Sequence, residues 1–463
     1  MSIFHPGVLF KEQGFRVAYW DQRFESEERL IDLIKSSKEI GVSALTGRQC
    51  GDAADILMLA KRIKPSIVTA AGGPHVHMLA DEVLAEPFVD KVYADKQYGE
   101  HLSPYDEQTK PYFALCDITY LSSTGCPYAC RYCSQIYDYW PRPVDHIDRD
   151  LSAIHHDTGF EHVAYVDPNM THFQWTDGDK KIRFDNVERL RQIGAIHRKL
   201  NITFDCSMRV PNVTRAMVDA LVEARCTKLF LGCESGNERV LRKVMLKGHG
   251  VGAIRDAARM LAGSGISTLY SFIGFAPGEA IEETHDTMDL IDWIMDTDDN
   301  ARVSVYHYSP YPGTPMYADA VAGRFGVEPF VPPTTMKGWA ARRLMNSAYY
   351  WIAGLNFRLD STQANFPGDD WKLIEPYVEL ARKQWINREI MEFPVEEVEA
   401  LIKVQVAKGD KKRRELRANG LRTADPGSLW HSGKPNMIPP GANTGQGHRI
   451  PLRFIDARDN TRV

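Results

Sequence analysis

The chain has 463 residues, of which 43% are hydrophobic and 25% charged, and its formal net charge is −5. This composition is ordinary for a globular protein with a large core, and the slight acidity argues against a general nucleic-acid or membrane surface. The sequence shows no basic leader and no apolar run of about 18 residues, so we expect neither a secretory signal nor a membrane-spanning helix. Eight cysteines in such a chain indicate a reducing, cytoplasmic location.

Residues 1–110 alternate strand and helix patterns, which predicts a doubly wound parallel sheet. The expected strands are Phe15–Asp21, Glu39–Thr46, Pro65–His75 and Val89–Ala94, and the expected helices are Gly7–Gly14, Ser26–Lys38, Gly51–Lys64 and Ala80–Glu86. The third strand ends in Gly72 and Gly73, where a ligand could approach the backbone closely at the sheet's edge. A plain tight turn explains this pair equally well. The polar residues 95–112 read as a linker.

Three cysteines, Cys126, Cys130 and Cys133, follow with C-x₃-C-x₂-C spacing. Cysteines at short loop spacings hold Fe–S clusters, and no fourth cysteine stands nearby, so a cubane held here would keep one iron open for an outside ligand. A disulfide is excluded because three is odd and the spacing is too close. A zinc site would need a fourth ligand, at a poor spacing, from His146, His155 or His156.

With Tyr132 just before the last cysteine, this motif resembles the signature loop of radical S-adenosylmethionine (SAM) enzymes. The resemblance implies a [4Fe–4S] cluster on the three cysteines, with SAM chelating the fourth iron through its amino and carboxylate groups. One electron, supplied by a donor such as a flavodoxin or ferredoxin, would then cleave SAM and usually release a 5′-deoxyadenosyl radical.

Residues 111–320 carry six strand patterns, most of them followed by helices, which implies parallel strands and a partial (β/α)₆ barrel, as radical SAM cores have. The expected strands are Phe113–Ser122, His162–Asp167, Ile202–Val210, Thr227–Glu234, Ser267–Phe275 and Ala301–Ser309. The expected helices are Ile147–Asp157, Asn186–Leu200, Thr214–Ala224, Glu238–Met245, Val251–Ser264 and Ile281–Asp296. Parallel barrels place their chemistry at the carboxyl ends of strands, and the cysteine loop follows the first strand.

The later strand ends match the places where the family binds SAM. The predicted SAM-binding residues are Tyr132, Asp167, Asn169, Ser207, Arg209, Glu234 and Gly274. By the resemblance, Asp167 and Asn169 would accept from the SAM ammonium, and Arg209 suits the SAM carboxylate as a planar fork. Glu234 would accept from ribose hydroxyls, and Gly274 would let the backbone approach adenine. Singly, each also has a structural explanation; Glu234, for example, could pair with Arg209 or Lys243.

The N-terminal half resembles the cobalamin-binding domain often fused to radical SAM enzymes, through Gly41–Thr46, Lys61–Pro65 and Gly72–His75. By that resemblance Ser43, Thr46, Gly72 and Gly73 would line a cobalamin site. The chain departs from the family in two ways: it has no D-x-H-x-x-G motif to ligate cobalt, and the usual first strand is missing. Cobalamin binding is therefore left open by the sequence.

Residues 321–463 have no assignable motif. Thr334–Leu355, Asp369–Met391 and Val395–Lys408 read as helices whose many Trp and Tyr side chains we expect to pack against the barrel, with a lid over its mouth as the alternative. The basic run Lys411–Arg417 reads as a solvated helix face, and the tail from Asp425 as irregular coil.

The sequence thus predicts a radical SAM enzyme that modifies a small-molecule biosynthetic substrate, with no nucleic-acid or membrane partner. Two chemistries remain open: cobalamin-dependent methyl transfer to an unactivated carbon or phosphorus, and direct hydrogen abstraction, rearrangement or transfer of another SAM-derived group. The alternative from another class is a non-catalytic Fe–S electron carrier, which would have no need of an adenosine site.

The residues that act on the substrate are not identified by the sequence. Cys116, Cys206 and Cys233 fall on predicted barrel strands, and soft thiolates there could hold a soft substrate atom or a second metal. Packing in the core is the default role for such thiols.

Overall fold

The computed structural model describes residues 4–21, 24–94, 103–115, 117–135, 139–172, 174–177, 180–183, 186–274, 276, 279, 281–308, 310–324, 331–341 and 453–457. The helices predicted at Asp369–Met391 and Val395–Lys408, the basic run Lys411–Arg417 and Cys116 lie outside these residues. None of the described helices is long and apolar enough to cross a bilayer.

The N-terminal domain is an α/β layer, as predicted. Its strands are β1 (Arg16–Trp20), β2 (Glu39–Ser43), β3 (Val68–Gly72) and β4 (Lys91–Tyr93), and β2, β3 and β4 run parallel. Its helices are α1 (Phe4–Glu12), α2 (Glu27–Ser36), α3 (Arg48–Ile63), α4 (Pro74–Met78) and α5 (Ala80–Leu84). Helix α2 begins where expected because the Ser26 hydroxyl accepts from the Arg29 amide (3.3 Å), a typical N-cap.

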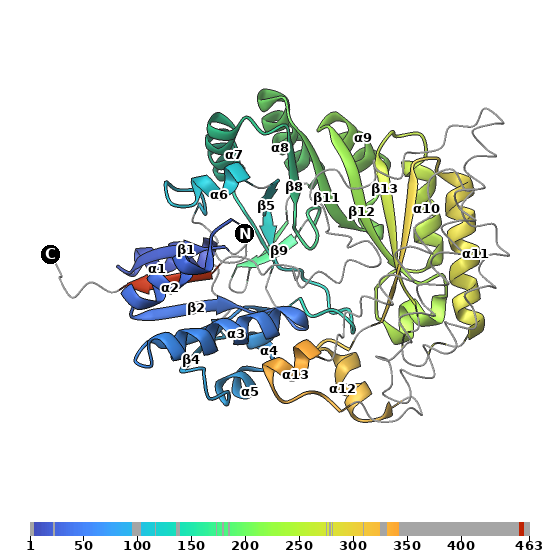
Figure 1. Ribbon diagram of the computed structural model, residues 1–463. Helices are drawn as coiled ribbons and strands as arrows, with labels where there is room; N and C mark the ends of the chain where they lie inside the picture. Colours follow the sequence, from blue (N-terminus) through green and yellow to red (C-terminus); the bar gives the residue numbers. More distant parts are fainter. Residues whose placement is uncertain are drawn as a thin grey trace, which may run out of the picture.

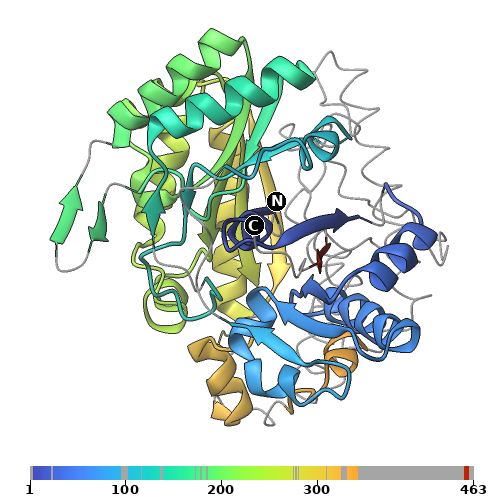
Figure 2. The same cartoon turned by 90° about the vertical axis from the view of Figure 1, so that its left-hand side faces the viewer.

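A fifth strand, β15 (Arg453–Ala457), comes from the far end of the chain and lies between β1 and β2, antiparallel to both. It is drawn in dark red in Figure 2. The prediction of irregular coil from Asp425 onward is wrong for these residues. The sheet has the strand order β1-β15-β2-β3-β4, so β15 fills the gap between β1 and β2. Pairing with β15 satisfies backbone groups that those two strands would otherwise leave unpaired.

The second sheet forms the half-barrel, with helices covering its outer face (Figure 1). Its strands are β5 (Ile118–Tyr120), β8 (His162–Tyr165), β11 (Thr203–Arg209), β12 (Cys226–Glu234), β13 (Ser267–Gly274) and β14 (Ala301–His307). They are all parallel, in the order β14-β13-β12-β11-β8-β5. The main helices are α7 (Val144–Thr158), α8 (Asn186–Leu200), α9 (Arg215–Glu223), α10 (Val251–Leu261) and α11 (Ile281–Thr297).

Several local predictions were wrong. Residues Phe113–Leu115 belong to a short helix, α6 (Lys110–Leu115), not to the first barrel strand. Asp106 and Thr109 bond each other's backbone amides with their side chains and start this helix, and Phe113 then stacks on Phe4 at 5.5 Å. The helix expected at Glu238–Met245, in contrast, does form, with π-helical geometry over Val240–Val244. The pairings β6 (Ser123–Thr124) with β7 (Trp140–Pro141) and β9 (Gln174–Asp177) with β10 (Lys180–Arg183) were not predicted.

Strand register fixes what faces the barrel lumen. Arg209, Gly232, Ser271 and Ser304 are register partners on neighbouring strands, so they share one face of the sheet. The preceding residues on these strands, Met208, Leu231, Tyr270 and Val303, are buried in the main hydrophobic core. The lumen side near the strand ends is therefore polar, while the opposite side packs under the helices.

After the half-barrel, α12 (Pro315–Val321) and α13 (Met336–Ala341) return to the N-terminal domain (Figures 1 and 2). Ala320, Met336 and Trp339 join the hydrophobic core of that domain. Trp339 was expected to pack against the barrel; instead its ring lies edge-on to His75 at 5.7 Å and is almost fully buried. The sequence around Trp339 does not indicate which domain this side chain packs against.

Candidate functional site

The cysteine loop follows β6 at the carboxyl end of the half-barrel, as the barrel prediction required. Its first turn uses Gly125 with φ +68°, a conformation that favours glycine. The Arg131 amide donates to the Met245 carbonyl (2.9 Å), and the Met316 amide donates to the Arg131 carbonyl (3.1 Å). The Arg131 guanidinium also pairs with the buried Asp319 of α12. The loop is thus fixed from two distant segments.

The three loop thiols are free and gather at one place. Cys126 and Cys130 are half-buried and Cys133 is exposed. They lie within electrostatic range of one another, yet in the described part of the chain no three His, Cys, Asp or Glu side chains close around a single metal ion. Three thiols near one another match the donor set of a [4Fe–4S] cluster, in which each thiolate binds a different iron.

Asp167 shapes the entry of the cysteine loop. Its carboxylate accepts from the Ser122 amide (2.7 Å), from the Ser123 hydroxyl (3.0 Å) and from the Ser122 hydroxyl. Burial raises the pKa of Asp167 to about 6, against the lowering effect of these hydrogen bonds. Both carboxylate oxygens already accept hydrogen bonds from Ser122 and Ser123. The structure therefore gives Asp167 a role in holding the loop, in addition to its predicted role at the SAM ammonium.

Arg209 and Asn169 carry buried donors that find no acceptor among the described residues. Arg209 donates through Nη2 to the Lys247 carbonyl, but its Nε and Nη1 are unpartnered, as is Nδ2 of Asn169. The Arg209 guanidinium carbon lies over the Tyr128 ring, 3.4 Å from its centroid. An unmade hydrogen bond at a buried donor costs about 1–3 kcal/mol. Free donors at the strand ends fit an anionic group such as the SAM carboxylate.

Glu234, the predicted ribose acceptor, is bound to two other side chains. Its Oε1 accepts from Lys247 Nζ (2.5 Å) and from the Tyr132 hydroxyl (3.0 Å), and Lys247 also donates to that hydroxyl (2.9 Å). The partner of Glu234 is thus Lys247, not Arg209 or Lys243. We call Tyr132, Glu234 and Lys247 the mouth cluster.

Ser207 and Gly274 lie where the prediction placed them. Ser207 is a register partner of Phe230 on the lumen side, and its carbonyl accepts from the Met170 amide (3.1 Å). Gly274 ends β13 and its carbonyl accepts from the Tyr308 amide (3.0 Å). Their roles at SAM remain predictions.

Cys206 and Cys233 do not face the lumen. Both belong to the main hydrophobic core, together with residues of the outer helices such as Ile193 and Leu221. Burial raises the pKa of the Cys233 thiol, which keeps it protonated. This placement supports the packing role and not the hypothesis that these thiols hold a soft substrate atom.

The carboxyl edge of the N-terminal sheet brings Ser43, Thr46, Gly72 and Gly73 together. Gly73 has φ +95°, and a Cβ there would lie 2.7 Å from Ser43 Oγ, so the pair serves close packing of the chain. Thr46 Oγ1 lies 3.0 Å from Nδ1 of His75. Nearby, helix α3 has no side-chain cap at its N-terminus.

Gln49, in the first turn of α3, has a buried Oε1 with no donor in the described part of the chain. Together with the uncapped amides of this helix, it offers both acceptor and donor groups at the edge. Such groups fit the amide side chains of a corrin. The chemistry of the edge therefore fits a corrin, although the sequence contains no D-x-H-x-x-G histidine.

Two family models match this chain: the radical SAM superfamily over residues 120–291 and the B12 binding domain over residues 3–101. The chain is a radical SAM enzyme with a B12-binding domain. A [4Fe–4S] cluster and SAM are the cofactors of this superfamily, and the expectations of fold and enzyme class are confirmed.

Relatives of the enzyme cover part of its length. It is 24% identical over 337 residues, 61% of this chain and 69% of the other, to an uncharacterized methyltransferase, PH0819, of Pyrococcus horikoshii. It is 27% identical over 295 residues, 60% of this chain and 59% of the other, to a tRNA-2-methylthio-N(6)-dimethylallyladenosine synthase of a Marinomonas species.

Two solved structures share the fold of the enzyme. The radical SAM methyltransferase TsrM of Kitasatospora setae, solved with cobalamin and a [4Fe–4S] cluster, has a TM-score of 0.55 at 13% identity, over 77% of this chain and 80% of the other. The cobalamin-dependent radical SAM enzyme OxsB, solved with aqua-cobalamin and SAM, has a TM-score of 0.55 at 14% identity, over 86% of this chain and 75% of the other.

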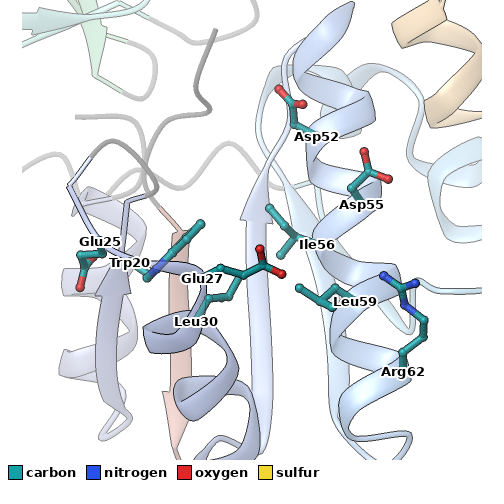
Figure 3. Close-up of a pocket in the computed structure, with 9 residues that line it drawn as sticks. All are labelled: Trp20, Glu25, Glu27, Leu30, Asp52, Asp55, Ile56, Leu59 and Arg62. Atoms are coloured by element: carbon teal, nitrogen blue, oxygen red, sulfur yellow. The ribbon is translucent and has the colours of Figure 1, made fainter. Parts of the chain in front are cut away.

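A pocket of about 480 Å³ lies elsewhere on the enzyme, between α2 and α3 (Figure 3). Its walls are Trp20, Glu25, Glu27, Leu30, Asp52, Asp55, Ile56, Leu59 and Arg62. It contains none of the residues predicted for SAM or cobalamin. Four carboxylates make its lining acidic, which disfavours an anionic ligand.

Sequence reasoning missed Lys247. This lysine follows Glu234 by 13 residues, and no motif marked it as a partner. The signal that could have found it is the next residue, Gly248, because a glycine can mark a tight turn. In the structure Gly248 has φ +80°, and this turn brings the chain close to Arg209.

Proposed function

We propose that the enzyme methylates a small-molecule substrate, with SAM and a [4Fe–4S] cluster at the mouth of the half-barrel and cobalamin at the edge of the N-terminal sheet. The observation that carries this proposal is the physical link between the two sites. Helix α12 contacts the cysteine loop through Met316 and Asp319, while Met336 and Trp339 of α13 belong to the core of the B12-binding domain.

The residues of the mouth would divide the work by their chemistry. Cys126, Cys130 and Cys133 would ligate three irons. The unpartnered donors of Arg209, with Asn169 beside β11, would bind the SAM carboxylate. Glu234 would accept hydrogen bonds from the ribose hydroxyls, and Tyr132 would line the nucleoside site. Gly274, which has no side chain, would let adenine approach the backbone closely.

Cobalamin, when bound, supplies a carrier for the methyl group. Ser43, Thr46, Gly72, Gly73 and Gln49 would hold it by hydrogen bonds and close backbone contact, without a histidine ligand from a D-x-H-x-x-G motif. We further propose that a flavodoxin or ferredoxin delivers the electrons and that the enzyme works in the cytoplasm on a substrate that is not a nucleic acid.

Anaerobic reconstitution tests this function. The enzyme should bind about four irons, retain a corrin with its visible absorption band, and cleave SAM when dithionite is added. Replacing Cys126, Cys130 and Cys133 by Ala should remove the iron and abolish SAM cleavage. A Cys233→Ala variant is the matched control, because that thiol is buried in the core and its loss should leave the iron content unchanged.

The outcomes separate the alternatives. SAM cleavage without a retained corrin would refute the cobalamin part and favour direct radical chemistry. Iron that stays bound in the triple variant would refute the cluster assignment itself.

A further inference from the structure

The mouth cluster is a buried ion pair tied to the residue before the last cysteine. The side chains of Lys247 and Glu234 are 7% and 9% exposed. Burying both charges is costly unless the pair is well hydrogen-bonded, and replacing such a pair by apolar groups is often neutral or stabilising. Overall stability therefore gives no strong reason for an ion pair at this position.

The backbone is distorted to accommodate this pair. Glu234 has φ +73°, in the left-handed region that a non-glycine residue rarely adopts. The register between β12 and β13 shifts at the same point, between Gly232 and Glu234. A Cβ on Gly232 would come within 2.6 Å of Glu234 Oε1 and 3.0 Å of Lys247 Nζ. Strain of this kind persists where the surrounding structure holds it, and it gathers at functional sites.

The charge of Lys247 reaches the cysteine loop. Its ammonium lies within electrostatic range of the thiols of both Cys126 and Cys133. It also stands 5.6 Å from the centroid of the Tyr132 ring, whose hydroxyl it bonds. Because Lys247 is itself buried, its charge acts on its neighbours more strongly than a charge at the surface would.

We propose that Lys247 is a positioning residue of the radical centre: it holds the Tyr132 ring and the Glu234 carboxylate beside the cysteine loop, and its positive charge raises the reduction potential of the cluster bound there. Reduction adds one negative charge to the cluster, so a nearby cation stabilises the reduced form and a nearby anion destabilises it. The negative charge of Glu234 partly offsets the effect of the lysine on the reduction potential. This inference rests on the proposed cluster site.

An EPR-monitored redox titration of the reconstituted enzyme without SAM tests the proposal. Lys247→Met should shift the midpoint potential to lower values, and Lys247→Arg, which keeps the charge, should stay close to the native value. Glu234→Gln should shift it in the opposite direction, to higher values. Lys243→Met is the matched control: this lysine is exposed on the same segment, where solvent screens its charge, and no shift is expected.

Opposite shifts at unchanged iron content would support the proposal, since mere structural damage would not reverse sign between the two variants. Equal potentials in native enzyme, Lys247→Met and Glu234→Gln would overturn it. If Lys247→Met fails to hold iron, Glu234→Gln decides, and the absence of an upward shift there overturns the proposal. A native enzyme that binds no cluster would refute the proposed function instead, before the potentials are compared.

Discussion

The mouth of the half-barrel and the carboxyl edge of the N-terminal sheet are both formed by the ends of parallel strands, but the chain lines them differently. The mouth carries charge: Arg209, Glu234 and Lys247 are all buried there. The N-terminal edge presents hydroxyls, an amide and glycines, and the imidazole beside Thr46, His75, is buried. Burial lowers the pKa of His75 to about 4, so this ring stays neutral near pH 7.

This difference shows how one chain prepares two strand ends for two kinds of ligand. Buried unpaired donors and a strained ion pair suit a charged ligand and a metal cluster, because charges interact strongly only where water is excluded. Neutral hydrogen-bonding groups and bare backbone suit a bulky ligand rich in amides. Variants at the two ends should therefore separate SAM binding from cobalamin binding.

The largest expected effect is at the mouth. Arg209→Met removes donors that we assign to the SAM carboxylate, at a cost of about 1.5–3 kcal/mol, so the Kd for SAM should rise roughly 10- to 100-fold. Equilibrium binding of SAM to the reconstituted enzyme measures this. Corrin retention should not change. Arg259→Met, at an exposed arginine paired with Asp256, is the control and should leave the Kd unaltered. Equal affinities in both variants would contradict the assignment.

At the N-terminal edge, Gly73→Ala should weaken the binding of cobalamin and leave the binding of SAM unchanged. Alanine is strained at φ +95° and ψ 178° and its Cβ would crowd Ser43, so we expect a loss of about 1–3 kcal/mol in unfolding free energy and weaker corrin retention. Iron content and SAM affinity should stay native. Gly252→Ala is the matched control, since nothing lies near its Cβ position on α10, and its stability should stay level or rise. If Gly73→Ala weakens SAM binding as much as corrin binding, the two ends are not separate.

The effect at the loop entry is spread over about two pH units and is therefore small at any one pH step. The pKa of Asp167 is raised in the folded state from 3.8 to about 6, so the folded protein binds the proton more tightly than the unfolded chain does. The resulting stabilisation is complete below pH 4 and is lost as the pH rises to about 6, with a slope of at most about 1.4 kcal/mol per pH unit. Urea unfolding between pH 4 and 7 should show this loss, and Asp167→Asn should remove it. An unchanged slope in that variant would assign the effect to other groups.

Much of the fold could be read from local pattern. The alternation of strands and helices in both halves is confirmed, and helix Asn186–Leu200 has the bounds that its apolar spacing predicted. The cysteine loop was recognisable because its three ligands lie close together in the chain and need no tertiary partner to be seen. In contrast, the strand predicted from Phe113 begins only at Ile118, because α6, which follows the reciprocal cap formed by Asp106 and Thr109, takes its first residues.

What the sequence alone determined is therefore what depends on neighbours in the chain: the two α/β layers, the strand ends and the cysteine loop. The tertiary structure alone decided that Lys247 joins Glu234, that Trp339 packs on His75 of the other domain, and that β15 lies between β1 and β2. These contacts join residues far apart in sequence, and their free energy comes from burial and pairing that exist only once the chain has folded. The local sequence pattern therefore does not predict these long-range contacts.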